Sequence, residues 1–140
     1  MMQLKMTIDE IHALLDGVWP AIGDYYRITE LSPGTATIVF QTRESDLRPG
    51  GTISGPTVFT VADLAFYLAT LAVIGPEALT VTTNLSVNFM RKAQLGPLRG
   101  EARVLKLGRS LSVGDVMVYS DVDDALIAHA SVTYSIPPKR

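Results

Sequence analysis

Asp63 is the residue whose chemistry the sequence isolates most clearly, because it is the only charged residue between Ser54 and Ile74. The rest of that run is nearly all apolar, and burying an ionised carboxylate there is costly unless a neighbour compensates the charge or its protonation is useful. One helical face carries the polar residues of the run, which follow one another at spacings of three, four and three: Thr60, Asp63, Tyr67 and Thr70. Asp63 is therefore a candidate nucleophile or general base, and the alternative is a structural aspartate hydrogen-bonded to threonines.

The segment that must position Asp63 is predicted to be one long helix from Ser54 to Ile74. Gly55-Pro56 is a typical helix start, since proline has no N–H to leave unpaired in the first turn. Gly75-Pro76 is a typical stop. The helix approaches membrane-spanning length, but Asp63, three threonines and the amphipathic strands that follow it favour a helix buried in a protein core.

The composition favours one globular domain over residues 1–140. Apolar residues make up 47% and charged residues 19% of the chain, and the net charge of −2 gives no general attraction to nucleic acid or to anionic membranes. Without cysteine there can be no disulfide and no thiolate chemistry. His12 and His129 lie far apart in the sequence, so we expect no histidine-based metal site. The first ten residues, MMQLKMTIDE, lack the apolar core of a signal peptide, and we expect a cytoplasmic protein.

Around the central helix, the pattern predicts one short helix and six strands. The short helix covers residues 7–16, and the strands cover 25–31, 35–42, 79–90, 96–107, 110–120 and 125–136. His12 is expected on the polar face of the short helix, and Trp19 is expected either to close one end of the core or to line a ligand tunnel. Four successive strands with short connections imply antiparallel pairing. We therefore expect an α+β fold in which a curved antiparallel sheet wraps one buried helix, with one sheet face left for an oligomer to cover.

Three segments of the sequence resemble a known enzyme family. They are SGPTVFTVAD, TTNLSVNFMRKAQLGPLRGEARVLKLGRS and DDALIAHASVTYSI. Together they are similar to the hotdog-fold acyl-CoA thioesterases of the phenylacetate-degradation (PaaI-like) branch of the 4-hydroxybenzoyl-CoA thioesterase superfamily. The resemblance covers roughly residues 25–136 and implies the hotdog fold.

Within this resemblance, two positions depart from the family pattern. The helix of this branch usually opens with His-Gly-Gly, and an aspartate follows nine residues after the histidine. Here Ser54-Gly55-Pro56 stands at the triplet and Asp63 at the aspartate. Arg48 stands where the family commonly has an asparagine that positions the substrate or a water molecule. These departures fit either a subfamily with a different acyl pocket or a protein with altered or lost activity.

Thioester hydrolysis needs a donor for the developing oxyanion and a carboxylate that attacks or activates water. The N–H of Gly55, at the positive end of the helix, suits the first task, and Asp63 suits the second. The two residues are eight positions apart, or roughly 12 Å along a helix, so one thioester cannot contact both in the same chain. A partner with an antiparallel helix would bring its own Asp63 to this Gly55, and we expect a site shared between subunits.

The resemblance also implies roles for residues outside the helix. Thr82 matches a serine or threonine that helps to hold the attacking water, although an ordinary strand threonine is the alternative. Substrate-binding roles are implied for Ser54 and Arg48 at the helix start. Phosphates of coenzyme A would be bound by cations at strand ends and by the GRS turn, namely Arg91, Lys92, Arg109 and Ser110. Solvated surface charge is the alternative for these cations.

The sequence therefore predicts an acyl-CoA thioesterase for an aryl or medium-chain acyl group. It would act as a homodimer or a dimer of dimers, with coenzyme A only as part of the substrate and no other cofactor. One alternative is a hotdog protein that binds acyl-CoA or another apolar ligand without hydrolysing it. A hydratase or dehydratase on this fold would need a histidine paired with a carboxylate, and neither His12 nor His129 stands near the helix start.

Overall fold

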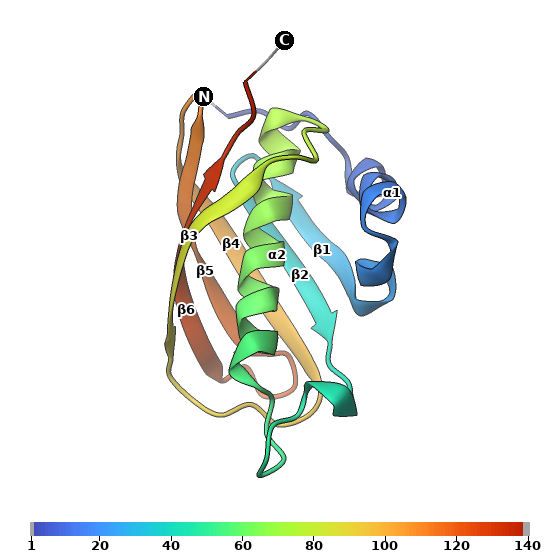
Figure 1. Cartoon of the computed structure of the whole chain (residues 1–140), viewed down its shortest axis with the longest axis vertical. Helices are drawn as coiled ribbons and strands as arrows, with labels where there is room; N and C mark the ends of the chain where they lie inside the picture. The colour runs from blue at the N-terminus through green and yellow to red at the C-terminus, as the bar shows by residue number, and fades with distance from the viewer. Residues whose placement is uncertain (1, 139–140) are drawn as a thin grey trace.

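The computed structural model describes residues 2–138 and contains a six-stranded antiparallel sheet curved around one long helix (Figure 1). The helices are α1 (Ile8–Val18) and α2 (Gly55–Ile74), with short 3-10 helices at Pro20–Tyr25 and Glu44–Asp46. The strands are β1 (Tyr26–Ser32), β2 (Thr35–Gln41), β3 (Val81–Phe89), β4 (Pro97–Leu107), β5 (Leu111–Ser120) and β6 (Leu126–Ser135). The predicted α+β hotdog fold is confirmed.

Helix α2 begins and ends where the sequence signals predict. The Ser54 hydroxyl caps the helix by accepting a hydrogen bond from the Thr57 N–H, with an Oγ–N distance of 3.3 Å. At the other end, Gly75 has a φ of 99°, in the left-handed region that favours glycine, and its N–H donates to the Leu71 carbonyl. Such a stop ends the helix just before Pro76.

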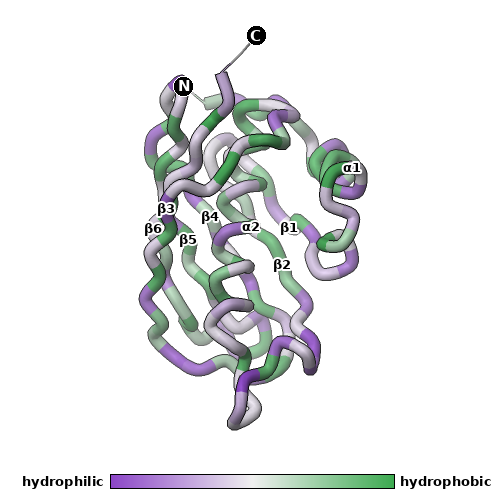
Figure 2. The backbone as a smooth tube through the Cα atoms, viewed as in Figure 1, coloured by the Kyte–Doolittle hydropathy of each residue, from purple (hydrophilic) through white to green (hydrophobic). Residues whose placement is uncertain are grey.

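The length and composition of α2 would also suit a membrane span, but its position in the molecule does not. The structure buries 78% of its most apolar window inside the protein. Figure 2, coloured by the hydropathy of each residue, shows α2 lying along one face of the sheet. Strand β5 approaches the helix so closely that a Cβ atom added at Gly114 would lie 2.6 Å from the Phe66 ring. Helix α2 is therefore the core helix that the sequence predicts.

The strand order across the sheet is β1-β2-β4-β5-β6-β3, and every neighbouring pair is antiparallel. The predicted antiparallel pairing is confirmed for these strands, and β3 pairs with β6 at the far edge instead of with β4, its successor in the sequence. The segment from Met90 to Gly96 allows this, because seven residues can span about 23 Å. Three strand spacings separate β3 from β4, which is only about 14 Å.

Helix α1 has 11 residues, one more than predicted, ends two residues later than predicted and lies against strand β1 (Figure 1). His12 is not simply a polar-face residue, because its ring stacks on Tyr26 at 4.9 Å and its Nε2 atom accepts a hydrogen bond from the Ile28 N–H. That N–H belongs to an edge strand and would otherwise lack a partner in the sheet. His12 thus fastens α1 to the edge of the sheet.

Candidate active site

The Asp63 carboxylate lies between α2, β3 and β6 and is half-buried. Two hydroxyl groups donate to the same carboxylate oxygen, Oδ1: Thr82 from β3 and Tyr134 from β6, each at 2.6 Å. Tyr134 also lies 3.0 Å from the Asp63 carbonyl oxygen. No hydrogen bond among residues 2–138 uses the other carboxylate oxygen, Oδ2. Two hydroxyl donors therefore stabilise the negative charge of Asp63 at Oδ1, and Oδ2 is left to accept a hydrogen bond or to react.

Thr82 reaches Asp63 because β3 is irregular. Strict alternation puts Thr82 on the opposite face from Leu85 and Val87, and the sequence predicted Thr82 on the polar face for that reason. The register of β3 against β6 shifts between Thr82 and Asn84. Thr82, Leu85 and Val87 consequently all face α2. The contact between Thr82 and Asp63 is direct, where the resemblance implied a contact with water.

Tyr134 is a site residue that the sequence interpretation missed. Its ring packs against Phe66 at 5.6 Å and against Tyr67 at 5.8 Å between centroids, and the residue is only 3% exposed. Burial, followed by the nearby charge of Asp63, raises the pKa of Tyr134 well above its ordinary value of 10. The phenol is therefore a permanent hydrogen-bond donor at working pH. Alternation along β6 places Tyr134 on the buried face with Ala130 and Val132, and this was the available sequence signal.

A cavity of about 380 Å³ opens beside this group. Its lining includes the two residues that bond Asp63, two further aromatic residues and the start of β3: Thr82, Tyr134, Trp19, Tyr67, Ala78, Leu79, Thr80, Val81 and Val18. The Tyr67 hydroxyl donates to the Ala78 carbonyl at 2.8 Å and holds the entry to β3 against α2. Trp19 thus lines a cavity, which was one of its two predicted positions.

Gly55 lies at the N-terminus of α2, and no hydrogen bond within the described part of the chain uses its N–H. A second cavity, of about 440 Å³, brings Gly55 together with Arg48, Arg91 and Lys92. All three cations are exposed, and none of the ion pairs among residues 2–138 includes them. The start of the helix and these three charges border the same cavity, which suits a bound anion.

Ser54 has a structural role at this helix start. The Thr57 hydroxyl donates its one proton to the Asp46 carboxylate at 3.0 Å, because a carboxylate can only accept. The Ser54 hydroxyl lies 3.0 Å from the Thr57 oxygen and must therefore donate its own proton there, while it accepts the Thr57 N–H. Ser54 has no proton left for a substrate, so any contact of its hydroxyl with a ligand would be as an acceptor.

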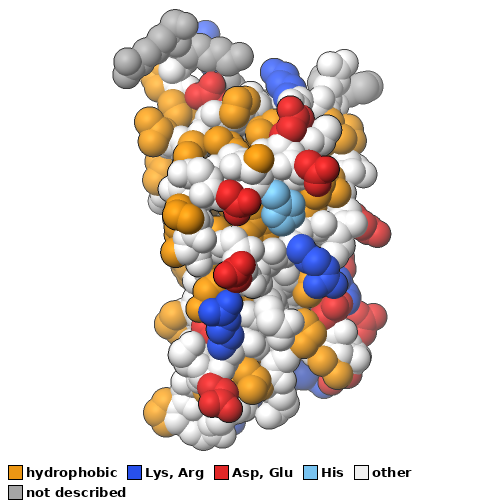
Figure 3. All heavy atoms as spheres, turned by 90° about the vertical axis from the view of Figure 1, so that its right-hand side faces the viewer, with side chains coloured by type: hydrophobic (Ala, Val, Ile, Leu, Met, Phe, Trp, Pro, Cys, Tyr) orange, Lys and Arg blue, Asp and Glu red, His pale blue; other side chains and the backbone are white. Residues whose placement is uncertain are grey.

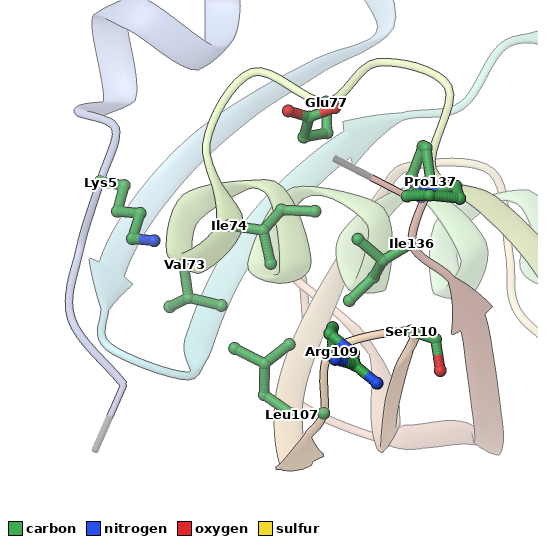
Figure 4. Close-up of a pocket in the computed structure, with 11 residues that line it drawn as sticks. Lys5, Val73, Ile74, Glu77, Leu107, Arg109, Ser110, Ile136 and Pro137 are labelled. Atoms are coloured by element: carbon green, nitrogen blue, oxygen red, sulfur yellow. The ribbon is translucent and has the colours of Figure 1, made fainter. Parts of the chain in front are cut away.

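Arg109 and Ser110 lie at the opposite end of α2 from Gly55. They line a third cavity, of about 600 Å³, together with Lys5 and apolar residues that include Ile74 and Ile136 (Figure 4). The Ser110 carbonyl accepts the Ile136 N–H at 2.8 Å and fixes the β4–β5 turn against the end of β6. Within one chain, the predicted site residues therefore form three groups, at the start, the middle and the end of α2.

The chemistry available at these groups is that of a carboxylate and a helix N-terminus. No cluster of three or more histidine or acidic side chains suited to a metal occurs among residues 2–138. A carboxylate with one free oxygen can attack a carbonyl carbon or accept a proton from water. The N–H at a helix start can stabilise a carbonyl oxygen that becomes negative. This combination suits hydrolysis of an ester or a thioester.

Comparison with known proteins agrees with this chemistry. Residues 50–127 match the model of the thioesterase superfamily. A "putative thioesterase" from Silicibacter sp. TM1040 is 46% identical, with a TM-score of 0.89, and the match covers 98% of this chain and 96% of that one. A phenylacetic acid degradation-related "putative thioesterase" from Ralstonia eutropha JMP134 is 25% identical, with a TM-score of 0.75 over 86% of this chain and 89% of that one.

A curated relative is also similar over most of its length. This "putative esterase" of Saccharolobus solfataricus is 29% identical over 135 residues, which is 94% of this chain and 86% of the relative. The family match spans more than half of the chain, and the hotdog architecture agrees with it. The chain therefore belongs to the thioesterase superfamily and is a thioester hydrolase.

Proposed function

We propose that the chain hydrolyses an aryl- or medium-chain acyl-CoA at a site shared by two copies of the chain. The observation that carries this proposal is the Asp63 carboxylate, held at Oδ1 by Thr82 and Tyr134 beside a cavity with aromatic walls. A half-buried carboxylate with one oxygen free is arranged for reaction with an uncharged carbonyl group.

Two reaction routes fit this arrangement. In the first, Asp63 Oδ2 attacks the thioester carbonyl carbon, the C–S bond breaks, and the thiolate of coenzyme A leaves and takes up a proton. Water then hydrolyses the acyl-aspartyl anhydride and restores the carboxylate. In the second, Oδ2 takes a proton from a water molecule while the water oxygen attacks the same carbon; the C–S bond then breaks, and the proton passes from Asp63 to the leaving thiolate, which restores the carboxylate. In both routes the carbonyl oxygen becomes negative and needs a donor such as the Gly55 N–H.

The shared site follows from distances along α2 and from the free edge of β3. Gly55 and Asp63 are roughly 12 Å apart along the helix, too far for one thioester carbonyl. Strand β3 is an edge strand, and Val81 and Phe89 on it are each 55% exposed. Pairing of two β3 edges about a two-fold axis would run the two α2 helices antiparallel. Asp63 of one copy would then approach Gly55 of the other.

In this arrangement, the remaining site residues would contact two parts of the substrate, the acyl group and the phosphates of coenzyme A. The aromatic walls beside Asp63 favour an aryl or a compact acyl group. The cations near Gly55 favour the phosphates of coenzyme A, which is the only cofactor moiety involved and enters as part of the substrate. Arg109 would contribute from the other copy: with Asp63 opposite Gly55, the end of that α2 lies eleven residues, or roughly 16 Å, beyond Gly55, a distance that an extended coenzyme A can span.

The test is turnover of an acyl-CoA panel by the parent chain and by Asp63→Asn. We expect the parent to hydrolyse benzoyl-, phenylacetyl- or hexanoyl-CoA faster than palmitoyl-CoA, and kcat to fall by at least about 10²-fold in Asp63→Asn. Asp115→Asn is the matched control, since Asp115 lies on the other face of the sheet and should keep parent turnover. Binding of these acyl-CoAs with no hydrolysis would contradict the proposal and support a non-catalytic binding protein.

A further inference from the structure

We infer that Tyr134 is a positioning residue for thioester hydrolysis, which together with Thr82 fixes Asp63 Oδ1 and leaves Oδ2 as the reacting oxygen. This inference rests on the proposed function of Asp63. It assigns a role to a β6 residue and decides which of the two carboxylate oxygens reacts.

The number of hydroxyl protons near Asp63 supports different roles for its two carboxylate oxygens. Tyr134 and Thr82 each have one hydroxyl proton, and both lie 2.6 Å from Oδ1. Two short, charge-assisted hydrogen bonds hold negative charge on Oδ1 and lower its reactivity toward a carbonyl carbon or a proton. Oδ2 accepts no hydrogen bond among the residues that the structure describes. It is therefore the oxygen available to the substrate or to water.

The two donors also fix the orientation of the carboxylate. They approach from different strands, β3 and β6, so rotation of the Asp63 side chain would break both bonds at once. The Tyr134 ring cannot follow such a rotation, because it is packed between the Phe66 and Tyr67 rings. A catalytic group that is held in this way needs no reorganisation when the substrate binds.

Tyr134 acts through Asp63 and not as an acid or base of its own. Its hydroxyl is already within hydrogen-bond distance of two Asp63 atoms, Oδ1 and the carbonyl oxygen. The raised pKa of the Tyr134 phenol keeps it protonated and makes it a poor acid for the leaving thiolate. Its expected signature is therefore in kcat and in the pH dependence of kcat, and not in substrate affinity.

The decisive variant is Tyr134→Phe, which removes the hydroxyl and keeps the packed ring. We expect kcat to fall on the order of 10- to 100-fold, the range for losing a hydrogen bond to a charged group, while KM changes less than about twofold. The acidic limb of the pH–kcat profile should also move to higher pH, because the ionised carboxylate loses a donor. Tyr26→Phe is the matched control: Tyr26 is also buried, and its hydroxyl has no hydrogen-bond partner in the described part of the chain.

A second variant keeps the inference testable if Tyr134→Phe does not fold. Thr82→Val is nearly isosteric and removes the other donor to Oδ1, so it should shift kcat and the acidic limb in the same direction. Unchanged kcat and an unmoved pH profile in both variants, with Asp63→Asn inactive, would overturn the role of Tyr134 and leave the proposed function standing. A loss of kcat with no movement of the pH profile would show a structural role only. Parent-like turnover by Asp63→Asn would refute the proposed function itself.

Discussion

At the scale of single residues, each reactive group keeps one polar atom without a hydrogen-bond partner in the described part of the chain. Asp63 has a bonded Oδ1 and a free Oδ2. Gly55 is a helical residue whose N–H has no hydrogen-bond partner in the described part of the chain. Such groups are stable in the folded chain and still able to bind or react.

The Gly55 N–H can be removed by substituting proline, with alanine as the control for the added side-chain carbon. Proline suits the first helical position, and Ser54 already has the extended conformation, with a ψ of 152°, that a residue before proline prefers. Position 55 also precedes Pro56, which disfavours helical backbone for any residue with a Cβ, so Gly55→Pro and Gly55→Ala should both lower the thermal midpoint. We expect kcat of Gly55→Pro to be about 10²-fold below that of Gly55→Ala, as for loss of one oxyanion donor. Gly55→Ala keeps the N–H, and its Cβ would meet the Phe89 ring at an ordinary 3.4 Å. Equal kcat values for the two variants would exclude an oxyanion role for this N–H.

Arg109 gives a prediction that separates binding from chemistry. Phosphate groups lie far from the thioester carbon, so their binding energy is nearly equal in the ground state and the transition state. Arg109→Ala should therefore raise KM more than it lowers kcat. Lys106→Ala removes a nearby exposed cation that is outside the Arg109 cavity and should leave KM unchanged. An unchanged KM in Arg109→Ala would make Arg109 an ordinary surface charge.

The sequence identified the site residues that belong to α2 more completely than those that meet it from the sheet. Asp63 and Gly55 were accessible because helical spacing and capping are local properties. The direct bond between Thr82 and Asp63 depends on a β-bulge, which alternation does not reveal. The bond from Tyr134 joins residues 71 positions apart, and no local pattern encodes such a contact.

At the scale of elements, the sheet face opposite α2 carries its own polar group. Asp115 of β5 accepts hydrogen bonds from Arg103 of β4 and His129 of β6 and so links three adjacent strands. Burial alone would raise the pKa of Asp115, but the hydrogen bonds and charges of Arg103 and His129 outweigh it and hold that pKa below its ordinary value. The ionised Asp115 therefore stabilises the folded sheet.

The pH dependence of stability follows from this lowered pKa. The contribution of Asp115 is fully present above the unfolded-state pKa of about 3.9 and is lost as pH falls through the lower folded-state pKa. Asp115→Asn should lower the thermal midpoint at pH 7, and the difference from the parent should shrink below about pH 4. Thermal unfolding followed at several pH values between 7 and 3 checks this. A difference that stays constant over that range would show that the charge of Asp115 contributes nothing.

The ends of the helices and strands could be predicted from the sequence. The order of the strands in the sheet could be predicted only in part. Turn residues and alternation locate β1, β2, β4, β5 and β6 within one or two residues. They do not say that β3 crosses to the far edge beside β6, because that choice depends on which arrangement encloses α2. The position of β3 matters most for function, since it brings Thr82 to Asp63.

At the scale of the whole molecule, β3 is the edge that a second copy would use. Figure 3 shows acidic, basic and hydrophobic side chains interspersed over the face on the α1 side. Strand β3, at the other edge, has Val81 and Phe89 exposed. An edge strand with exposed apolar side chains favours addition of another strand.

Assembly through β3 can be tested with one added charge. We expect the parent chain of 15.1 kDa to sediment at micromolar concentration with at least twice that mass. Val81→Lys should shift the chain toward the monomer, because lysine on an edge opposes strand pairing. Val122→Lys is the control, since Val122 is exposed in the turn between β5 and β6. A monomeric parent with full activity would rule out a two-copy site.

The most direct test of the shared site mixes two inactive chains. Asp63→Asn and Gly55→Pro, carrying different affinity tags, are co-expressed, and the heterodimer is isolated by two successive purifications. If each site combines Asp63 of one copy with Gly55 of the other, the heterodimer has one site with both groups intact and should recover about half of the parent kcat per dimer. Turnover no higher than that of the two homodimers would contradict a site shared between copies.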